Sequence, residues 1–420
     1  MRIVFLAVVL GLLALIHWYL WKRLVRDVSR PGSVFRRAGT LLILLFPLLM
    51  LTFFAGRALG LPFAVEQVIA WPGAYWFVVM LYLGLALLAG EIVRPLLLRA
   101  LERRALDDAG RLSRPGLTGT EAEAEAPAVS AEEKTGTGDE AQDGPASPER
   151  RLFVARAIAI GAGAVAVGTV GYGSHAARQL TTKHVPVQLA GLPRAAHGYR
   201  IAVVSDIHLS SLLGASHCRR VVDVVNRTGA DLVAVVGDLV DAGVEDLRSA
   251  AAPLAELSSR DGTFFVTGNH EYYVGAEQWL DHLRNLGMVV LENERREMPY
   301  FDLAGVNDVA GEDSGQGPDF TAALGDRDRR RTSVLLAHQP VLIHDAVEHG
   351  VDLQLSGHTH GGQLWPGNAL AALANPTLEG LERYGDTQLY VTRGAGTWGP
   401  PVRVGAEPDI TVVELSSPQA

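Results

Sequence analysis

The stretch IAVVSDIH at residues 201–208 joins a short apolar run to polar side chains that bind metals. Four later stretches repeat this form, with an apolar run of strand length followed at once by acidic, amide or histidine residues. They are LVAVVGDLVD at 232–241, TFFVTGNHE at 263–271, SVLLAH at 333–338 and VDLQLSGHTHGGQ at 351–363. Helix-like stretches separate these runs at 219–229, 244–258 and 276–287, and Gly and Asn mark the joins. This alternation predicts a layered α/β domain.

The polar side chains that follow the runs have the chemistry of metal ligands. Hard and borderline metal ions bind carboxylate, imidazole and amide groups, and loops at strand ends are a usual place to gather them. Asp206 and His208 are two apart in an extended segment, so they point to the same side and can hold one ion. Asp238 can bridge two ions through its two oxygens. The predicted ligands are Asp206, His208, Asp238, Asn269, His338, His358 and His360.

Two ions held close together can share a hydroxide and clamp an oxyanion, which is a usual device for phosphoester hydrolysis. The ligand types therefore predict two divalent cations as cofactors. Mn, Fe, Zn and Ca ions all suit a mixed nitrogen and oxygen shell, and the sequence does not choose among them.

Composition indicates a membrane region attached to one domain. The chain has 420 residues, of which 48% are hydrophobic, and long apolar runs crowd the first 175. The net charge is −9, and the segment 107–149 supplies most of it, with eleven acids and three bases. The remainder is close to neutral and has no basic surface of the kind that binds nucleic acid, so we expect no nucleic-acid partner. The single cysteine, Cys218, excludes an intramolecular disulfide.

Three apolar segments in the first 106 residues predict transmembrane helices, because a helix needs roughly 20 apolar residues to cross a bilayer. They are Ile3–Trp21, Thr40–Ala55 and Trp71–Gly90, and the last opens with an interfacial aromatic cluster. Residues 22–37 and 91–104 are rich in arginine, whereas residues 56–70 contain one arginine and one acid. The positive-inside rule then places 22–37 and 91–151 in the cytoplasm.

Residues 107–149 lack aromatic residues and any periodicity, which predicts an acidic disordered linker. Residues 150–176 follow as a fourth transmembrane segment, or as a signal anchor of the twin-arginine type, since Arg150-Arg151 precedes a mildly apolar stretch. Ser174-His175-Ala176 is a weak cleavage site. Either interpretation places residues 184–420 on the extracytoplasmic side of a multi-pass cell-membrane protein.

In order along the chain, the motifs D-x-H, G-D-x-x-D, G-N-H-E, a single His and G-H-x-H closely resemble the calcineurin-like metallophosphoesterase superfamily. The ending GHTHGGQ and the later segment 390–396 are similar to its membrane-associated bacterial subgroup. The resemblance covers residues 184–415 and implies a four-layer αββα sandwich. It also implies a phosphoric ester hydrolase.

The resemblance assigns roles by motif position. One ion would bind Asp206, His208, Asp238 and His360, and the other Asp238, Asn269, His338 and His358. His270 would assist the leaving oxygen, with Asp241 holding its imidazole. Arg393 is a candidate for substrate binding or for a structural ion pair. Many phosphatases of the superfamily have Arg where this chain has Ala242, so their phosphate clamp is not expected here.

The resemblance favours a membrane-anchored phosphomonoesterase or phosphodiesterase, with a lipid-linked substrate among the options. In that mechanism a metal-bridging hydroxide attacks phosphorus. One alternative is a pyrophosphohydrolase of the UDP-diacylglucosamine type, although an outward-facing site argues against it. Others are a non-catalytic membrane sensor or scaffold, which would lack a ligand, and a transporter, which would need charges inside the spans. The oligomeric state stays open.

Overall fold

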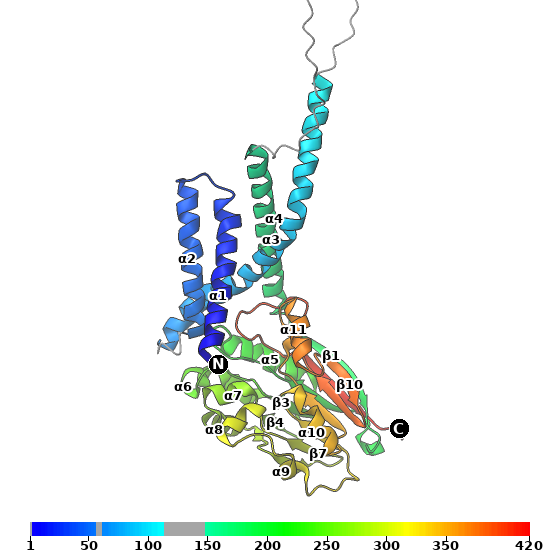
Figure 1. Cartoon of the computed structure of the whole chain (residues 1–420). Helices are drawn as coiled ribbons and strands as arrows, with labels where there is room; N and C mark the ends of the chain where they lie inside the picture. The colour runs from blue at the N-terminus through cyan, green and yellow to red at the C-terminus, as the bar shows by residue number, and fades with distance from the viewer. Residues whose placement is uncertain (1, 56–60, 113–147) are drawn as a thin grey trace, which may run out of the picture. The chain divides into compact units, whose positions relative to one another are not determined.

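The computed structural model describes residues 2–55, 61–112 and 148–420, and the chain divides into two compact units (Figure 1). The first unit contains Met1–Leu45 and Met80–Ala166, and the second contains Phe46–Val79 and Val167–Ala420. Most of the predicted linker at 107–149 lies outside the described residues. Its described ends, 107–112 and 148–149, are helical.

Among the described residues, four helices are long and apolar enough to cross a membrane. They are α1 (Arg2–Trp21), α2 (Val34–Ala55), α3 (Phe63–Leu112) and α4 (Pro148–Ala176). A π-helical turn, Lys22–Arg26, continues α1. Because α3 has 50 residues, it is about 75 Å long at 1.5 Å per residue, more than twice the bilayer core. Only part of α3 can therefore lie in hydrocarbon.

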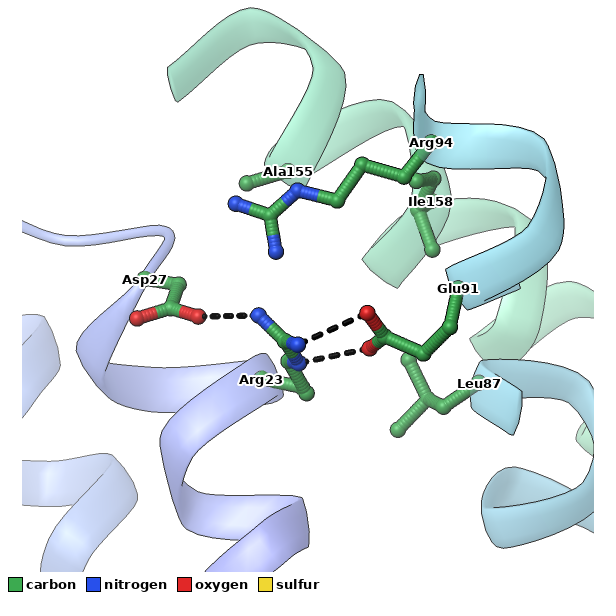
Figure 2. Close-up of a pocket in the computed structure, with 7 residues that line it drawn as sticks. All are labelled: Arg23, Asp27, Leu87, Glu91, Arg94, Ala155 and Ile158. Carbon is green, nitrogen blue, oxygen red and sulfur yellow. Dashed lines mark hydrogen bonds and ion pairs between the residues drawn. The ribbon is translucent and has the colours of Figure 1, made fainter. Parts of the chain in front are cut away.

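Within the first unit, Arg23 forms ion pairs with two acidic residues (Figure 2). Its Nη1 lies 2.8 Å from Asp27 Oδ2, and its Nε lies 2.6 Å from Glu91 Oε1. Arg94 lies across the same small pocket, which is also lined by Leu87, Ala155 and Ile158. An unpaired charge among apolar helices is costly, so these ion pairs let Glu91 and Arg23 remain charged there.

The second unit contains two six-stranded sheets. The first has the strand order β1-β12-β2-β3-β4-β5, and the second has the order β10-β11-β9-β8-β7-β6. Strands β2 to β5 are mutually parallel, as are β7, β8, β9 and β11. The strand bounds are β1 Thr181–Gln188, β2 Tyr199–Val204, β3 Leu232–Val236, β4 Thr263–Val266, β5 Val289–Val290, β6 Glu294–Glu297, β7 Asp302–Gly305, β8 Ser333–Leu336, β9 Leu353–Ser356, β10 Gly380–Tyr384, β11 Thr387–Val391 and β12 Asp409–Ser416.

The sheets pack face to face because alternate residues of each central strand point to opposite sides. In β2, Ile201 and Val203 enter the core between the two sheets, whereas Ala202 and Val204 enter the core under the helices of the first sheet. A third core lies under the helices that cover the second sheet. Helices, two sheets and helices make the four-layer αββα sandwich, which confirms the predicted fold class.

Short helices cover the outer faces of the two sheets. On the first sheet they are α5 (Ala215–Thr228), α6 (Val244–Ala251) and α8 (Ala276–Asn285), at the three predicted helical stretches. On the second sheet they are α9 (Phe320–Leu324) and α10 (Ile343–Glu348). Two others are α7 (Asn269–Val274), which begins within the G-N-H-E motif, and α11 (Gly367–Ala374), which begins four residues after the GHTHGGQ motif.

A candidate metal centre

Each of the five motifs begins directly after the carboxyl end of a strand: β2, β3, β4, β8 or β9. The loops there have an unusual backbone. Asp206, His208, Asp238, His358 and His360 have positive φ angles between 49° and 73°. Residues other than glycine rarely adopt this region, and such strain concentrates at functional sites. The five are also among the predicted metal ligands.

One group of predicted ligands consists of Asp206, His208 and His360, all three buried. His208 Nε2 lies 3.0 Å from His360 Nε2, and His360 Nε2 lies 3.4 Å from Asp206 Oδ1. Ligand atoms about 2.1 Å from one ion lie about 3 Å apart when they subtend a right angle. The spacing therefore suits a shared cation.

A second group consists of Asp238, His338 and His358. Asp238 Oδ2 lies 3.2 Å from His338 Nε2, which in turn lies 3.3 Å from His358 Nδ1. His338 Nδ1 lies 2.8 Å from the carbonyl oxygen of Val236, to which it can donate. That hydrogen bond sets the tautomer and leaves the Nε2 lone pair free for a metal.

Asp238 and Asn269 complete the two groups. Asp238 Oδ2 also lies 3.8 Å from His208 Nε2, so this carboxylate faces both groups. Asn269 Oδ1 is buried and has no hydrogen-bond partner among the residues that the structure describes. A buried polar atom without a partner costs free energy, unless a cation or water meets it. The donor set and this oxygen therefore fit divalent metal ions.

Two glycines allow the loops to come together at the centre. A Cβ atom at Gly268 would collide with the carboxylate of Asp238, and one at Gly357 would collide with that of Asp206. The buried side chain of Glu271 fixes the same region, because its carboxylate accepts hydrogen bonds from the backbone N–H groups of Leu239 (2.8 Å) and Gly268 (2.7 Å). Glu271 thus supports its loop.

Asp241 contacts both His270 and His208. Its Oδ1 lies 2.8 Å from His270 Nδ1 and 2.7 Å from His208 Nδ1. Sequence reasoning paired Asp241 with His270 alone, because only the folded loops bring His208 to the same oxygen. The other ring nitrogen of His270 lies 3.9 Å from Asp238 Oδ2. His270 therefore stands at the edge of the two ligand groups.

Arg403 has no motif in the sequence and lies directly behind the centre. Its side chain is fully buried, its Nη2 lies 3.0 Å from His360 Nδ1, and it donates to the carbonyl oxygen of Gly396. The backbone N–H of Gly396 donates in turn to the carbonyl oxygen of Asp206. Arg403 thus holds the loop that supports two predicted ligands.

Arg393 contacts acidic side chains in the structure. Its guanidinium pairs with Glu379 and, at 3.4 Å, with Glu407. The structure brings the other nine predicted site residues together around the two groups, whereas Arg393 contacts neither of them. Its role in substrate binding stays a prediction.

The charges of the centre depend on these contacts. Burial would lower the pKa of His208, but Asp241, Asp238 and Asp206 raise it to about 9. Burial also opposes the charged form of Asp241, but His208 and His270 lower its pKa to about 2. Burial lowers the pKa of His358 to about 4.

Without a metal, the nearby carboxylates therefore favour the protonated form of His208. Burial would lower the pKa of His338 too, yet Asp238 and Asp206 raise it well above the usual range. Cations can replace those protons, and metal binding at such a site is coupled to proton release.

Comparisons with known proteins give the family. Residues 199–362 match the family described as calcineurin-like phosphoesterase. An uncharacterized metallophosphoesterase of Helicobacter pylori is 41% identical over 236 residues, which are 56% of this chain and 63% of that protein. A Danio rerio transmembrane protein with a metallophosphoesterase domain is 38% identical over 245 residues, 55% of this chain and 56% of that protein.

The chain thus spans little more than half the length of these relatives. An Aquifex aeolicus metallophosphoesterase is 35% identical over 241 residues, and the match covers 56% of this chain and 92% of that protein. Because this match is above 30% identity and covers almost the whole Aquifex protein, this chain belongs to the calcineurin-like metallophosphoesterase family.

Proposed function

We propose that this chain is a membrane-anchored phosphoesterase with a binuclear metal centre, which hydrolyses a phosphomonoester or a phosphodiester. The observation that carries the proposal is the carboxylate of Asp238, which faces both ligand groups at 3.2 Å from His338 and 3.8 Å from His208. Asp206, His208 and His360 would hold one ion together with Asp238. Asn269, His338 and His358 would hold the other together with it.

Two bound ions would supply an activated water and would neutralise the phosphoryl oxygens. The protein's own contribution is at the leaving group. His270 would donate the proton on Nε2 to the ester oxygen as the phosphorus–oxygen bond breaks, while the new bond forms from water. Asp241 accepts a hydrogen bond from His270 Nδ1, which orients the ring.

A non-catalytic sensor or scaffold is the main rival proposal. Such a protein would be expected to have lost at least one ligand, and all seven predicted ligands are present. A pyrophosphohydrolase acting on a nucleotide sugar would need a cytoplasmic site. We propose instead that the catalytic domain is extracytoplasmic, on the basis of the arginine-rich segments at 22–37 and 91–104.

Asp238→Asn tests the shared centre directly. We expect the variant to lose metal and activity together, by more than about 100-fold, because even residues behind the ligands change these by 10–100-fold. The full-length protein is assayed for bound metal and on a panel of phosphomonoesters and phosphodiesters. The matched control is Asp281→Asn, a change at a side chain that is 69% exposed. A variant that retained two metals and normal turnover would refute the assignment.

A further inference from the structure

Helix α11 exposes an apolar surface close to the metal centre. Its sequence is GNALAALA, it carries no charge, and none of its residues is buried. Leu370 and Leu373 are 73% and 86% exposed. The helix begins seven residues after the predicted ligand His360. Exposed leucines in a row on a short neutral helix are unusual on a soluble surface and indicate a partner that is apolar.

Aromatic side chains extend this apolar surface to the catalytic residues. Trp365 and Trp398 are 56% and 58% exposed. The ring of Trp398 lies 6.1 Å from that of His270, and the ring of the exposed Tyr273 lies 5.4 Å from that of His270. The Gln363 side chain fixes the Trp398 backbone, since its Oε1 accepts from the Trp398 N–H at 3.0 Å. Apolar surface therefore runs from α11 to the edge of the centre.

The same loop is joined to the end of the fourth membrane helix. The backbone N–H of Arg403 donates to the carbonyl oxygen of Gly173 in α4, and that of Trp365 donates to the carbonyl oxygen of Val404, both at 2.9 Å. Neighbouring residues 403 and 404 thus connect α4 to the base of α11. In Figure 1, α11 lies beside the end of α4 that leads into β1.

Two other membrane helices reach loops around the centre within the same unit. Phe53 of α2 lies 3.8 Å from the position of a Cβ at Gly399, next to Trp398. Ala70 and Ala74 of α3 pack against Leu212, in the loop that follows His208. Within the second unit, the loops around the metal centre therefore contact the ends of these three helices.

We propose that α11, Trp365 and Trp398 form a surface that inserts into the bilayer interface, and that the substrate is a phosphoester of a membrane lipid. Transfer of a leucine side chain from water to hydrocarbon is favourable, and tryptophan prefers the headgroup level of the bilayer. A lipid phosphate at that level lies beside His270, while the acyl chains stay in the bilayer. The substrate class rests on the proposed function, whereas the insertion of α11 does not.

The insertion is tested without reference to activity. Cys218 is the only cysteine and is fully buried, so a fluorophore reacts selectively at Leu373→Cys in the full chain. In phosphatidylcholine vesicles we expect its emission to be quenched by brominated lipid. A label at Val347→Cys, on exposed residue 347 of α10, should not be quenched. Equal quenching at both sites, or no quenching at Leu373→Cys, would overturn the insertion. If the labelled protein formed dimers through α11 and showed no quenching, a second copy of the chain would be the partner that covers α11.

The substrate class is tested with two substrates in the same vesicles, phosphatidic acid and a water-soluble aryl phosphodiester. Leu370→Asn with Leu373→Asn should lower the rate on the lipid about tenfold or more. The rate on the soluble ester should be unchanged, since both leucines are exposed and outside the centre. Val341→Ser with Val347→Ser is the matched control and should change neither rate.

These results separate the two proposals. Parallel loss on both substrates, or no loss on the lipid, would overturn the lipid assignment while leaving the phosphoesterase in place. A wild-type protein that hydrolyses neither ester and binds no metal would refute the proposed function itself. In that case quenching at Leu373→Cys would still decide whether α11 enters the membrane.

Discussion

At the scale of single residues, one oxygen of Asp241 serves two histidines with different proposed tasks. His208 is a proposed metal ligand, and His270 is the proposed proton donor, yet both Nδ1 atoms lie within 2.8 Å of Asp241 Oδ1. Removing His270 and changing Asp241 should therefore have separable effects.

His270→Ala should retain both metals, because the proposed ligands do not include it. Its rate should fall by about 10²–10⁴, the usual contribution of general acid catalysis. The loss should be largest for substrates with poor leaving groups, since an activated aryl oxide needs little protonation. Rates across a leaving-group series check this, with the exposed His344→Ala as the control. An equal loss across the series would reject the general-acid role.

Asp241→Asn should weaken metal binding as well as turnover, in contrast to His270→Ala. The carboxylate accepts from His208 Nδ1, and removing such a partner behind a metal ligand costs about 10–100-fold in affinity or activity. Titration of the metal-free protein with Mn²⁺ and with Zn²⁺ measures the change. If Asp241→Asn binds metal as wild type does, its contact with His208 has no function in metal binding.

At the scale of elements, α5 has a buried histidine that makes the protein sensitive to acid. His217 is 5% exposed, and burial together with Arg220 lowers its pKa to about 4. The unfolded chain takes up this proton near pH 6.5. The contribution of His217 to the free energy of unfolding is therefore fully present above about pH 6.5. It is lost as the pH falls from 6.5 through about 4.

His217→Gln should reduce the loss of stability on acidification. One proton bound only by the unfolded state gives a slope of about 1.4 kcal/mol per pH unit, and the glutamine variant should lack it. Urea unfolding of the full chain in detergent with a chelator, between pH 4.5 and 7, measures the difference. His349→Gln is a suitable control because it leaves His217 in place. Parallel pH profiles for wild type and His217→Gln would contradict the assignment.

At the scale of the whole molecule, the ends of three apolar helices belong to the same compact unit as the catalytic domain. The second unit includes the end of α2, the start of α3 and the end of α4 as well as both sheets. The segment between α2 and α3 and the catalytic domain should therefore face the same side of the membrane. This agrees with the small number of charged residues at 56–70.

A protease site introduced at Gln419 tests that side. We expect the site to be cut by a protease added to cells whose outer envelope is permeabilised and whose cell membrane is intact. The reason is that the arginine-rich segments 22–37 and 91–104 should stay in the cytoplasm, which places the catalytic domain on the other side. A second site placed in the residues 113–147 should be protected until the cells are lysed. The reverse pattern would place the catalytic domain in the cytoplasm.

The sequence by itself determined the layered α/β domain, the apolar helices and the chemistry of the centre. These features are local: strands show period-two apolar patterns, and each ligand follows its strand within a few residues. Asp206 and Asp238 could be chosen from their motifs, and His338 from its place directly after an apolar run. The apolar segments that precede the domain could also be predicted locally, because the length of an apolar run indicates whether a helix can cross a bilayer.

Only the tertiary structure decided which distant groups share a partner. Residues 208, 241 and 270 meet because three parallel strands end at one edge of a sheet. A sequence motif gives no information about the distance between residues that follow different strands. Arg403 acts through carbonyl oxygens and one imidazole, contacts that any sequence around it could provide. The exposure of α11 was equally hidden, because an apolar octapeptide is buried or exposed according to whether another element packs against it.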